Sequence, residues 1–250
     1  MGTPWDARSY ERISAPQQSW AADVLARLRG IPQDAVVLDV GCGAGQVTEA
    51  LLELVPHGRV LALDASQAMV DRARERLGDR ARVWCQDVLE LTLEAPVDAL
   101  FSTATLHWVR DHDRLWERLA GALAPGGRIE AQCGGEGNIA RVRTVIDAVA
   151  VELAPELVGF TPWTFAGPEQ TEQRMRAHGF EAIRCWLEPR PTCPADAAAF
   201  VRTSILAAHL ERLDAERAER AERFAAAVSA RVELPLDYVR LNISARRGAG

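Results

Sequence analysis

The feature that most constrains the fold of this chain is a glycine-rich turn between an apolar segment and a helical pattern. Segment 36–40 reads Val-Val-Leu-Asp-Val, and Gly41, Gly43 and Gly45 follow at alternate positions. Apolar residues on both sides of one Asp are typical of a strand that is covered on both faces. Glycines let the backbone approach a ligand where side chains would collide. The stretch therefore predicts a cofactor pocket with these three glycines in its turn.

Two classes of cofactor compete for this turn, a dinucleotide and S-adenosylmethionine. A dinucleotide loop requires a third glycine three residues after the second, and Gln46 occupies that position. Asp39 would also repel a pyrophosphate, whereas S-adenosylmethionine carries an ammonium, a sulfonium and no phosphate. We therefore assign Asp39 to the ammonium of the ligand. The alternative is an acid that satisfies only the amides of the loop.

A second acid follows the next apolar segment. Segment 59–63 is followed by Asp64, which stands nineteen residues after Gly45. A carboxylate at this place can accept both hydrogens of a ribose diol. Asp64 is thus expected to bind the ribose of an adenosyl cofactor.

The order of apolar and helical segments indicates the fold class. Strands are expected at 36–40, 59–63, 81–85, 97–102 and 128–133, and helices at 17–29, from 46, at 69–77 and at 114–123. This alternation predicts an α/β fold with a doubly wound, mainly parallel sheet and helices on both faces. Ligands then lie beyond the carboxyl ends of the strands, where Asp39, Asp64, Asp87 and Ser102 occur.

We expect one domain over residues 1–250. Its parts are an N-terminal arm and helix (1–30), a cofactor-binding core (31–133), a partial helical cap (134–180) and the last strands with a helical insertion (181–250). Segment 238–245 alternates with a period of two and is expected to be an antiparallel edge strand paired with 181–187. The charged helical stretch 195–232 is expected to be a solvated face.

Composition narrows the function classes. All 29 basic residues are arginines, which excludes a Schiff-base lysine and a Walker-type phosphate lysine. The net charge of -6 argues against a nucleic-acid substrate. The spacing of the five cysteines, with no pair two residues apart, predicts reduced thiols and a cytoplasmic protein. The lack of a long apolar run or secretory segment argues against a membrane partner. We also expect a monomer or homodimer.

The order of these motifs resembles that of the class I S-adenosylmethionine-dependent methyltransferases, most closely the trans-aconitate methyltransferase branch. The resembling parts are residues 5–10, 39–45, 63–66 with Met69, 86–88, 105–108 with Asp111, and 123–127. They cover the first half of the chain well and the rest weakly. The resemblance implies a Rossmann-like, seven-stranded sheet and S-adenosylmethionine as cofactor, with S-adenosylhomocysteine as product.

The resemblance also implies roles for individual residues. Asp87 would accept from the adenine amino group, although a helix cap is the alternative for this acid. Apolar Met69 and Val88 would enclose the adenine beside Ala65, unless they belong to the core. Ser102 and Thr103 would approach the methionine portion, and Tyr10 would close over the cofactor from the N-terminal arm.

His107 follows the fourth strand, where the methyl group must meet its acceptor. Its ordinary pKa suits a general base, and a structural histidine is equally compatible with the sequence. Trp108 is expected to pack on the following helix. Asp111 and Asp113 precede a helical segment and are read as a cap and dipole pair, so no metal is expected.

The acceptor is the least constrained part of the prediction. Trp163 and Phe165 are candidates for its pocket, and Arg141 and Arg143 for a carboxylate clamp. We expect methyl transfer to a small molecule, at a carboxylate or hydroxyl oxygen. The alternatives are a C- or N-methyltransferase of a secondary metabolite, a nicotinamide dehydrogenase, and a catalytically silent S-adenosylmethionine-binding protein.

Overall fold

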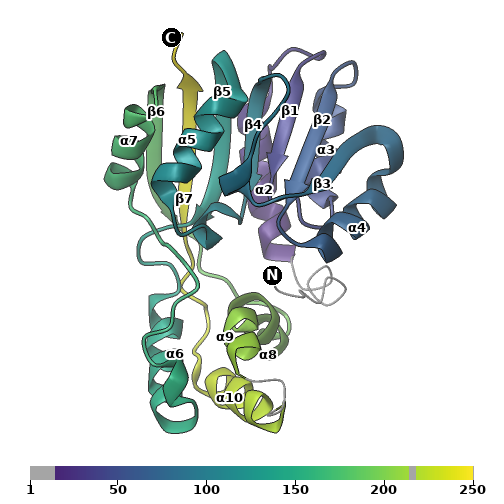
Figure 1. Cartoon of the computed structure of the whole chain (residues 1–250). Coiled ribbons are helices and arrows are strands. Elements are labelled where there is room, and N and C mark those ends of the chain that lie inside the picture. Colours follow the sequence, from purple (N-terminus) through teal and green to yellow (C-terminus); the bar gives the residue numbers. More distant parts are fainter. Residues whose placement is uncertain (1–14, 214–217, 250) are drawn as a thin grey trace.

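The core of the molecule is a seven-stranded sheet (Figure 1). The computed structural model describes residues 15–213 and 218–249. The strand order is β3-β2-β1-β4-β5-β7-β6, and β7 runs antiparallel to both of its neighbours, β5 and β6. The strands are β1 (Val36–Val40), β2 (Arg59–Asp64), β3 (Ala81–Cys85), β4 (Val97–Thr103), β5 (Leu123–Gly134), β6 (Phe180–Pro189) and β7 (Val239–Arg247). The expected α/β sheet with an antiparallel last strand is confirmed.

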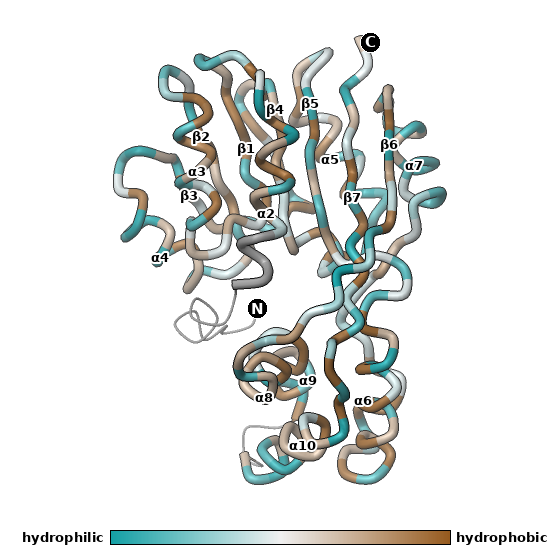
Figure 2. Tube along the Cα trace, turned by 180° about the vertical axis from the view of Figure 1, so that it is seen from behind, coloured by the Kyte–Doolittle hydropathy of each residue, from teal (hydrophilic) through white to brown (hydrophobic). Residues whose placement is uncertain are grey.

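Helices cover both faces of the sheet because neighbouring residues of a strand point to opposite sides. On one face, α2 (Ala15–Leu28) and α3 (Gln46–Leu54) share a core cluster with Val37 and Phe101. On the other face, α5 (His112–Ala122) and α7 (Pro168–Ala177) share a cluster with Leu38 and Leu100. Figure 2 shows the molecule from behind, with α2 in front of the sheet. The helix α4 (Gln67–Leu77) packs against β2 and β3.

The position of β7 corrects one expectation. Segment 238–245 was expected at the edge of the sheet, but β7 lies between β5 and β6, and β6 forms the edge. The burial of the two strands explains this order. Residues 240–243 of β7 are all buried, whereas most residues of β6 are partly or fully exposed.

A helical cap lies beyond one end of the sheet (Figure 1). It consists of α6 (Ala140–Leu153), α8 (Ala197–Phe200), a π-helical turn (Val201–Ile205), α9 (Ala207–Arg212) and α10 (Ala218–Arg231). Phe200, Ile205 and Phe224 form a buried cluster with Ile146 and Trp163. The stretch 195–232 is therefore part of the cap and not only a solvated face.

The cap boundary also differs from the predicted one, because α7 packs on β6 and buries Met175 in the core of the sheet. Short turns of 3₁₀-helix connect the elements: η1 (Gly78–Arg80), η2 (Val88–Glu90), η3 (Leu106–Trp108) and η4 (Pro155–Leu157). Among the helices of residues 15–213 and 218–249, none has the length and apolarity needed to cross a membrane.

Candidate active site

A cleft opens at the carboxyl ends of β1 to β4, and the order of the strands in the sheet reverses between the parallel strands β1 and β4. Ligands of open α/β sheets bind at this kind of switch point. The cavity measures about 560 Å³, which falls within the size range of small-molecule sites. Its lining includes Gly41, Gly43, Asp64, Ala65, Ser66, Met69, Gln86, Asp87, Val88, Thr103, Ala104, Thr105 and Trp108.

The glycine turn after β1 forms one wall of the cleft. The amides of Gly41 and Cys42 donate to the carbonyl of Leu63, at 2.8 and 3.0 Å, which holds the turn against β2. Gly41 has φ +77°, and a Cβ there would collide with the side chain of Thr105. Only glycine both adopts a positive φ without strain and has no Cβ to collide with Thr105. Gly45 also has a positive φ, but it lies at the start of α3 and does not line the cleft.

Asp64 at the end of β2 is held in one position by two backbone amides. Oδ2 accepts from Gly43 N–H and Oδ1 from Ser66 N–H, both at 2.9 Å. Burial raises the pKa of this carboxyl above its ordinary value. Each oxygen still has a free lone pair, so the carboxylate can accept from a ribose diol.

Asp39 does not line the cleft, which differs from its predicted contact with the ligand. Its carboxylate is buried and accepts from the hydroxyl of Thr48 at 2.7 Å. Burial raises the pKa of Asp39 to about 7, opposed by the Thr48 hydrogen bond. The side chain of Asp39 points into the protein, where its hydrogen bond with Thr48 links β1 to α3 on either side of the glycine turn.

Met69, Asp87 and Val88, the three residues predicted to surround an adenine, all line the cleft. Asp87 also caps η2, because its Oδ1 accepts from Leu89 N–H at 2.9 Å. The cap alternative and a ligand contact are therefore compatible, since Oδ2 remains available.

At the end of β4 the structure separates two neighbouring residues. Thr103 lines the cleft, whereas the hydroxyl of Ser102 is buried and donates to the carbonyl of Val40 at 2.8 Å. Ser102 thus joins β4 to β1 and does not reach the cavity. Ala104 has φ +56°, a strained conformation for a non-glycine residue.

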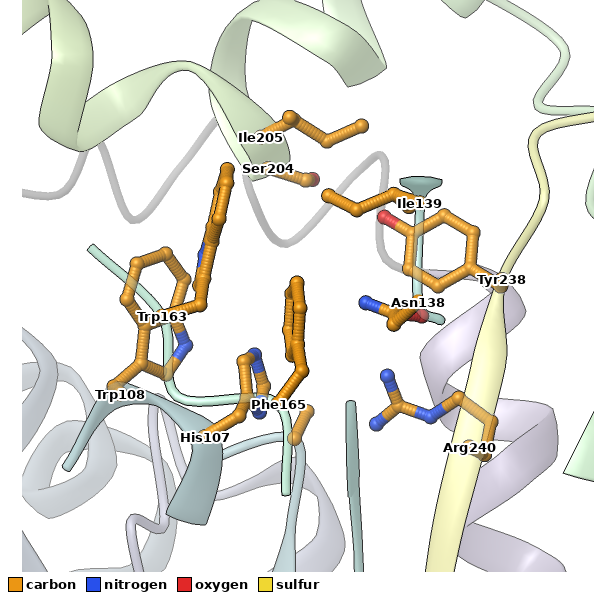
Figure 3. A pocket seen from close by; sticks show the side chains of 11 residues that line it. His107, Trp108, Asn138, Ile139, Trp163, Phe165, Ser204, Ile205, Tyr238 and Arg240 are labelled. Atoms are coloured by element: carbon orange, nitrogen blue, oxygen red, sulfur yellow. The ribbon is translucent and has the colours of Figure 1, made fainter. Parts of the chain in front are cut away.

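A second, smaller cavity adjoins the cleft, and Ala104 and Trp108 line both. Figure 3 shows its aromatic wall, where Trp163 and Phe165 lie beside His107 and Trp108. The rings of Trp163 and Phe165 stack at 5.5 Å with an interplanar angle of 11°. Trp108 therefore lines the site instead of only packing on a helix. We refer to this space as the ring cavity.

His107 is buried at the junction of β4, β5 and the ring cavity. Its Nδ1 accepts a hydrogen bond from Gly134 N–H at 3.3 Å, so the neutral ring carries its proton on Nε2. Burial, together with the charge of Arg240, holds the pKa of His107 well below its ordinary value. This arrangement makes the ring a neutral hydrogen-bond donor, which is a poor general base.

The two predicted clamp arginines do not meet in the ring cavity. Arg141 is held outside it, since its backbone N–H donates to Asp237 at 2.8 Å and its guanidinium donates to the carbonyl of Pro235. Arg143 lies over the outer ring face of Phe165, at 5.9 Å, and lines a separate small cavity with His209. Because they are two residues apart on α6, the two arginines lie on different sides of the helix, and neither lines the cleft or the ring cavity.

Sequence reasoning missed Asn138, Ser204, Tyr238 and Arg240, which line the ring cavity. Arg240 lies on β7, far along the chain from His107. The alternating pattern of this segment predicted a strand but did not indicate that Arg240 lines a cavity. The predicted contact of Tyr10 lies outside the described residues. In residues 15–213 and 218–249, no three His, Cys, Asp or Glu side chains are grouped as a metal site would require. The side chain of Asp111 caps α5 by accepting from Arg114 N–H, as expected.

Comparison with known proteins agrees with this geometry. The family described as "Methyltransferase domain" matches residues 37–127. Trans-aconitate 2-methyltransferase of Methylobacterium nodulans is 41% identical over 51% of this chain and 49% of its own length. The enzyme of the same name from Acidovorax ebreus is 31% identical over 74% of this chain and 67% of its own length. The matched region thus spans about half of the first relative and two thirds of the second.

Solved structures share the fold at low identity. Phosphoethanolamine N-methyltransferase 2 of Haemonchus contortus, solved with S-adenosylhomocysteine, superposes with a TM-score of 0.66 at 18% identity, covering 97% of this chain and 57% of the other. The [4+2]-cyclase SpnF superposes with a TM-score of 0.62 at 23% identity, covering 94% of this chain and 84% of the other. A cyclase among these neighbours illustrates that the fold alone does not define the reaction.

Fold, cleft and sequence relatives together place the chain in the class I S-adenosylmethionine-dependent methyltransferases. The cofactor of this family is S-adenosylmethionine, and the open cleft with Asp64 and the glycine turn in its lining agrees with that ligand. Within the family, the chain is similar to the trans-aconitate methyltransferase branch.

Proposed function

We propose that this chain transfers the methyl group of S-adenosylmethionine to a carboxylate oxygen of a small organic acid. The observation that carries the proposal is the junction of two cavities. The cleft suits an adenosyl cofactor, and the adjoining ring cavity meets it at Ala104 and Trp108. A methyl group at this junction faces whatever the ring cavity holds.

In the cleft, Asp64 would accept from the ribose hydroxyls and Asp87 from the adenine amino group. Met69 and Val88 would enclose the adenine ring. The glycine turn at Gly41 would lie against the methionine portion, because no side chain intervenes there. These roles are the ones that the family resemblance implies, and the positions of the residues around one cavity support them.

The reaction is an in-line displacement at the methyl carbon. A carboxylate oxygen forms the new C–O bond as the C–S bond breaks, and the sulfonium becomes a neutral thioether. No proton moves, because a carboxylate is already ionised at pH 7. The protein then has to align the two ligands and exclude water.

The state of His107 favours a carboxylate over a hydroxyl acceptor. A hydroxyl has to lose a proton during transfer, which requires a base near its oxygen. The Nδ1 of His107 is engaged by Gly134 N–H, and its pKa is low. The relatives' names also denote acids, trans-aconitate and, in Ilyobacter polytropus, a malonyl group on acyl-carrier protein.

The pH dependence of His107→Asn tests this mechanism. Asn keeps an acceptor for Gly134 N–H and removes the imidazole, so we expect kcat with an acid acceptor to stay within about tenfold of the parent and to be flat between about pH 6.5 and 9. His112→Asn is the matched control, because His112 is also buried but lines neither cavity. Methyl-ester formation, followed by mass spectrometry, gives the rates.

A loss of turnover of about 10³-fold in His107→Asn alone, with unchanged cofactor affinity, would contradict the base-free mechanism and favour a hydroxyl acceptor. The control variant then identifies any loss that comes from folding.

A further inference from the structure

We propose that Trp163 limits the length of the acceptor, so that the site accepts short acids and excludes acids with a long body. This inference rests on the proposed carboxyl methylation and names the class of acid that the same site selects. It follows from the place of Trp163 between two cavities, which neither the motifs nor the relatives' names indicate.

Trp163 lines two cavities that are separate in this structure. One is the ring cavity. The other, which we call the distal cavity, is lined by Arg143, Ile146, Asp147, Gly159, Phe160, Thr161, Trp163 and His209. Among the described residues, Trp163 is the only one that the two linings share. The indole therefore stands between the two spaces.

The aromatic neighbours of the indole belong to different cavities. Its ring stacks on Phe165, which lines the ring cavity, at 5.5 Å. Its centroid also lies 5.4 Å from that of His209, which lines the distal cavity. Figure 3 shows the indole beside Phe165 and Trp108, where it forms one side of the ring cavity. Removal of the indole would thus join the two cavities.

The segment around Trp163 is held in place on both sides of this residue. The N–H of Thr164 donates to the carbonyl of His107 at 2.8 Å, and the guanidinium of Arg110 donates to the carbonyl of Thr161 at 2.7 Å. The side chain of Trp163 is 7% exposed and packs among the rings described above. Because both backbone and side chain are held, the indole is a fixed wall of the ring cavity.

The volumes of the two cavities define the length limit. The ring cavity measures about 40 Å³ and the distal cavity about 70 Å³. One water molecule requires roughly 10–15 Å³ of such space, so the ring cavity has room for about three or four non-hydrogen atoms. With its reacting carboxylate at the junction with the cleft, a longer acid would meet the indole. Without the indole, its chain could continue against Ile146 and Phe160.

Straight-chain acids of increasing length test this limit directly. Butanoate, hexanoate and octanoate share the reacting group and differ only in their methylene groups. With the full chain and S-adenosylmethionine, we expect kcat/KM for methyl-ester formation to be at least about tenfold higher for butanoate than for octanoate, because a packed space does not admit extra methylenes without strain. Mass spectrometry of the esters gives the rates. Calorimetry of the same acids with the S-adenosylhomocysteine complex reports the length selection independently of turnover.

The contribution of Trp163 is tested with Trp163→Ala. We expect the ratio of kcat/KM for hexanoate to that for butanoate to rise at least about tenfold over the parent, since each methylene buried in the joined cavity is worth about fourfold in affinity. Trp163→Leu and Trp163→Phe remove less of the side chain and should give smaller shifts, with Phe the smallest. These two variants also test the length limit if the Ala variant does not fold.

Trp186→Ala is the matched control. Trp186 lies on the edge strand β6, where its ring contacts Arg27 and Arg184, and it lines none of the three cavities. This variant should keep the length preference of the parent. Because neither tryptophan lines the cleft, the affinity of all variants for S-adenosylhomocysteine should stay within about threefold of the parent.

The outcomes separate this inference from the function on which it rests. Equal use of butanoate and octanoate by the parent, or an unchanged length preference in the Trp163 variants, would overturn the inference. Methylation of trans-aconitate but of none of the straight-chain acids in any variant would also overturn it and leave carboxyl methylation intact. Bound cofactor without ester formation from any of these acids would instead contradict the proposed carboxyl methylation, and the calorimetric length order would then decide the role of Trp163.

Discussion

Asp64 organises the cofactor cleft through contacts that are present without any ligand. The carboxylate bridges the glycine turn and the loop after β2, because its two oxygens accept from Gly43 and Ser66. Its burial raises the pKa, so a cation in the cleft would favour the ionised form. The position of this acid in the cleft is thus fixed before any ligand binds.

The buried carboxyl of Asp39 should make the folding stability of the protein depend on pH. The pKa of this buried carboxyl is raised to about 7, so the folded protein holds a proton that the unfolded chain releases from about pH 4 upward. Folding stability from this group is therefore fully present below pH 4 and falls as the pH rises to about 7. Asp39→Asn should remove this decline, a difference on the order of 4 kcal/mol between pH 4 and pH 7.

Urea unfolding of the parent and of Asp39→Asn at several pH values checks this prediction. Asn retains an acceptor for the Thr48 hydroxyl, so the two proteins should have similar stability near pH 4. Parallel stability curves across this pH range would show that Asp39 does not titrate with a raised pKa.

The helices of the cap pack around a buried cluster of their own, and its stability should affect acceptor binding. Phe224 of α10 is fully buried in the cap cluster, which is separate from the three clusters of the sheet. Phe224→Ala should destabilise the cap by about 3–5 kcal/mol. Because the cap contributes Trp163 and Ser204 to the ring cavity, acceptor KM should rise, while the affinity for S-adenosylhomocysteine stays within about threefold.

Val151→Ala is the matched control for the cap, since Val151 lies on α6 with 65% of its surface exposed. We expect a change in unfolding free energy below about 0.5 kcal/mol for this variant. Equal losses of acceptor and cofactor binding in Phe224→Ala would mean that the cap and the cleft do not act as separate units.

Most elements were predictable because their signals are local. The strands β1 to β4 and the helices between them follow from apolar runs and from turn residues such as Gly41. The place of β7 between β5 and β6 was not predictable from its own residues, because an alternating strand can lie in the interior or at an edge. The cap role of 195–232 was missed for a similar reason, since Arg220 pairs with Glu156 of η4, a residue far from it in the sequence.

In the candidate site, too, the residues with a local sequence signal were predictable and the others were not. Asp64, Asp87 and Thr103 line the cleft as expected, because parallel strands end at one edge of the sheet. Asp39 and Ser102 were expected there too, but each points into the protein and bonds to a neighbouring element. Arg240 carried no local signal, since only the pairing of β7 with β5 brings it near His107.

At the scale of the whole molecule, the sheet provides the cofactor cleft and the cap closes the adjoining ring cavity. Ala104 and Trp108 belong to both spaces, so the two ligands would meet at the end of β4. The strained backbone at Ala104 lies at this junction. In the proposed function, the residues of the cleft hold the cofactor and the cap residues contribute to the selection of the acceptor.

The central claim is that the cleft binds an adenosyl sulfonium compound and not a dinucleotide. Isothermal titration of the purified chain with S-adenosylmethionine, S-adenosylhomocysteine and NAD⁺ tests it most directly. We predict saturable binding of the first two, no binding of NAD⁺, and an affinity about 10- to 100-fold lower in Asp64→Asn, which loses a charged hydrogen bond. Saturable binding of NAD⁺ without binding of either adenosyl compound would contradict the claim.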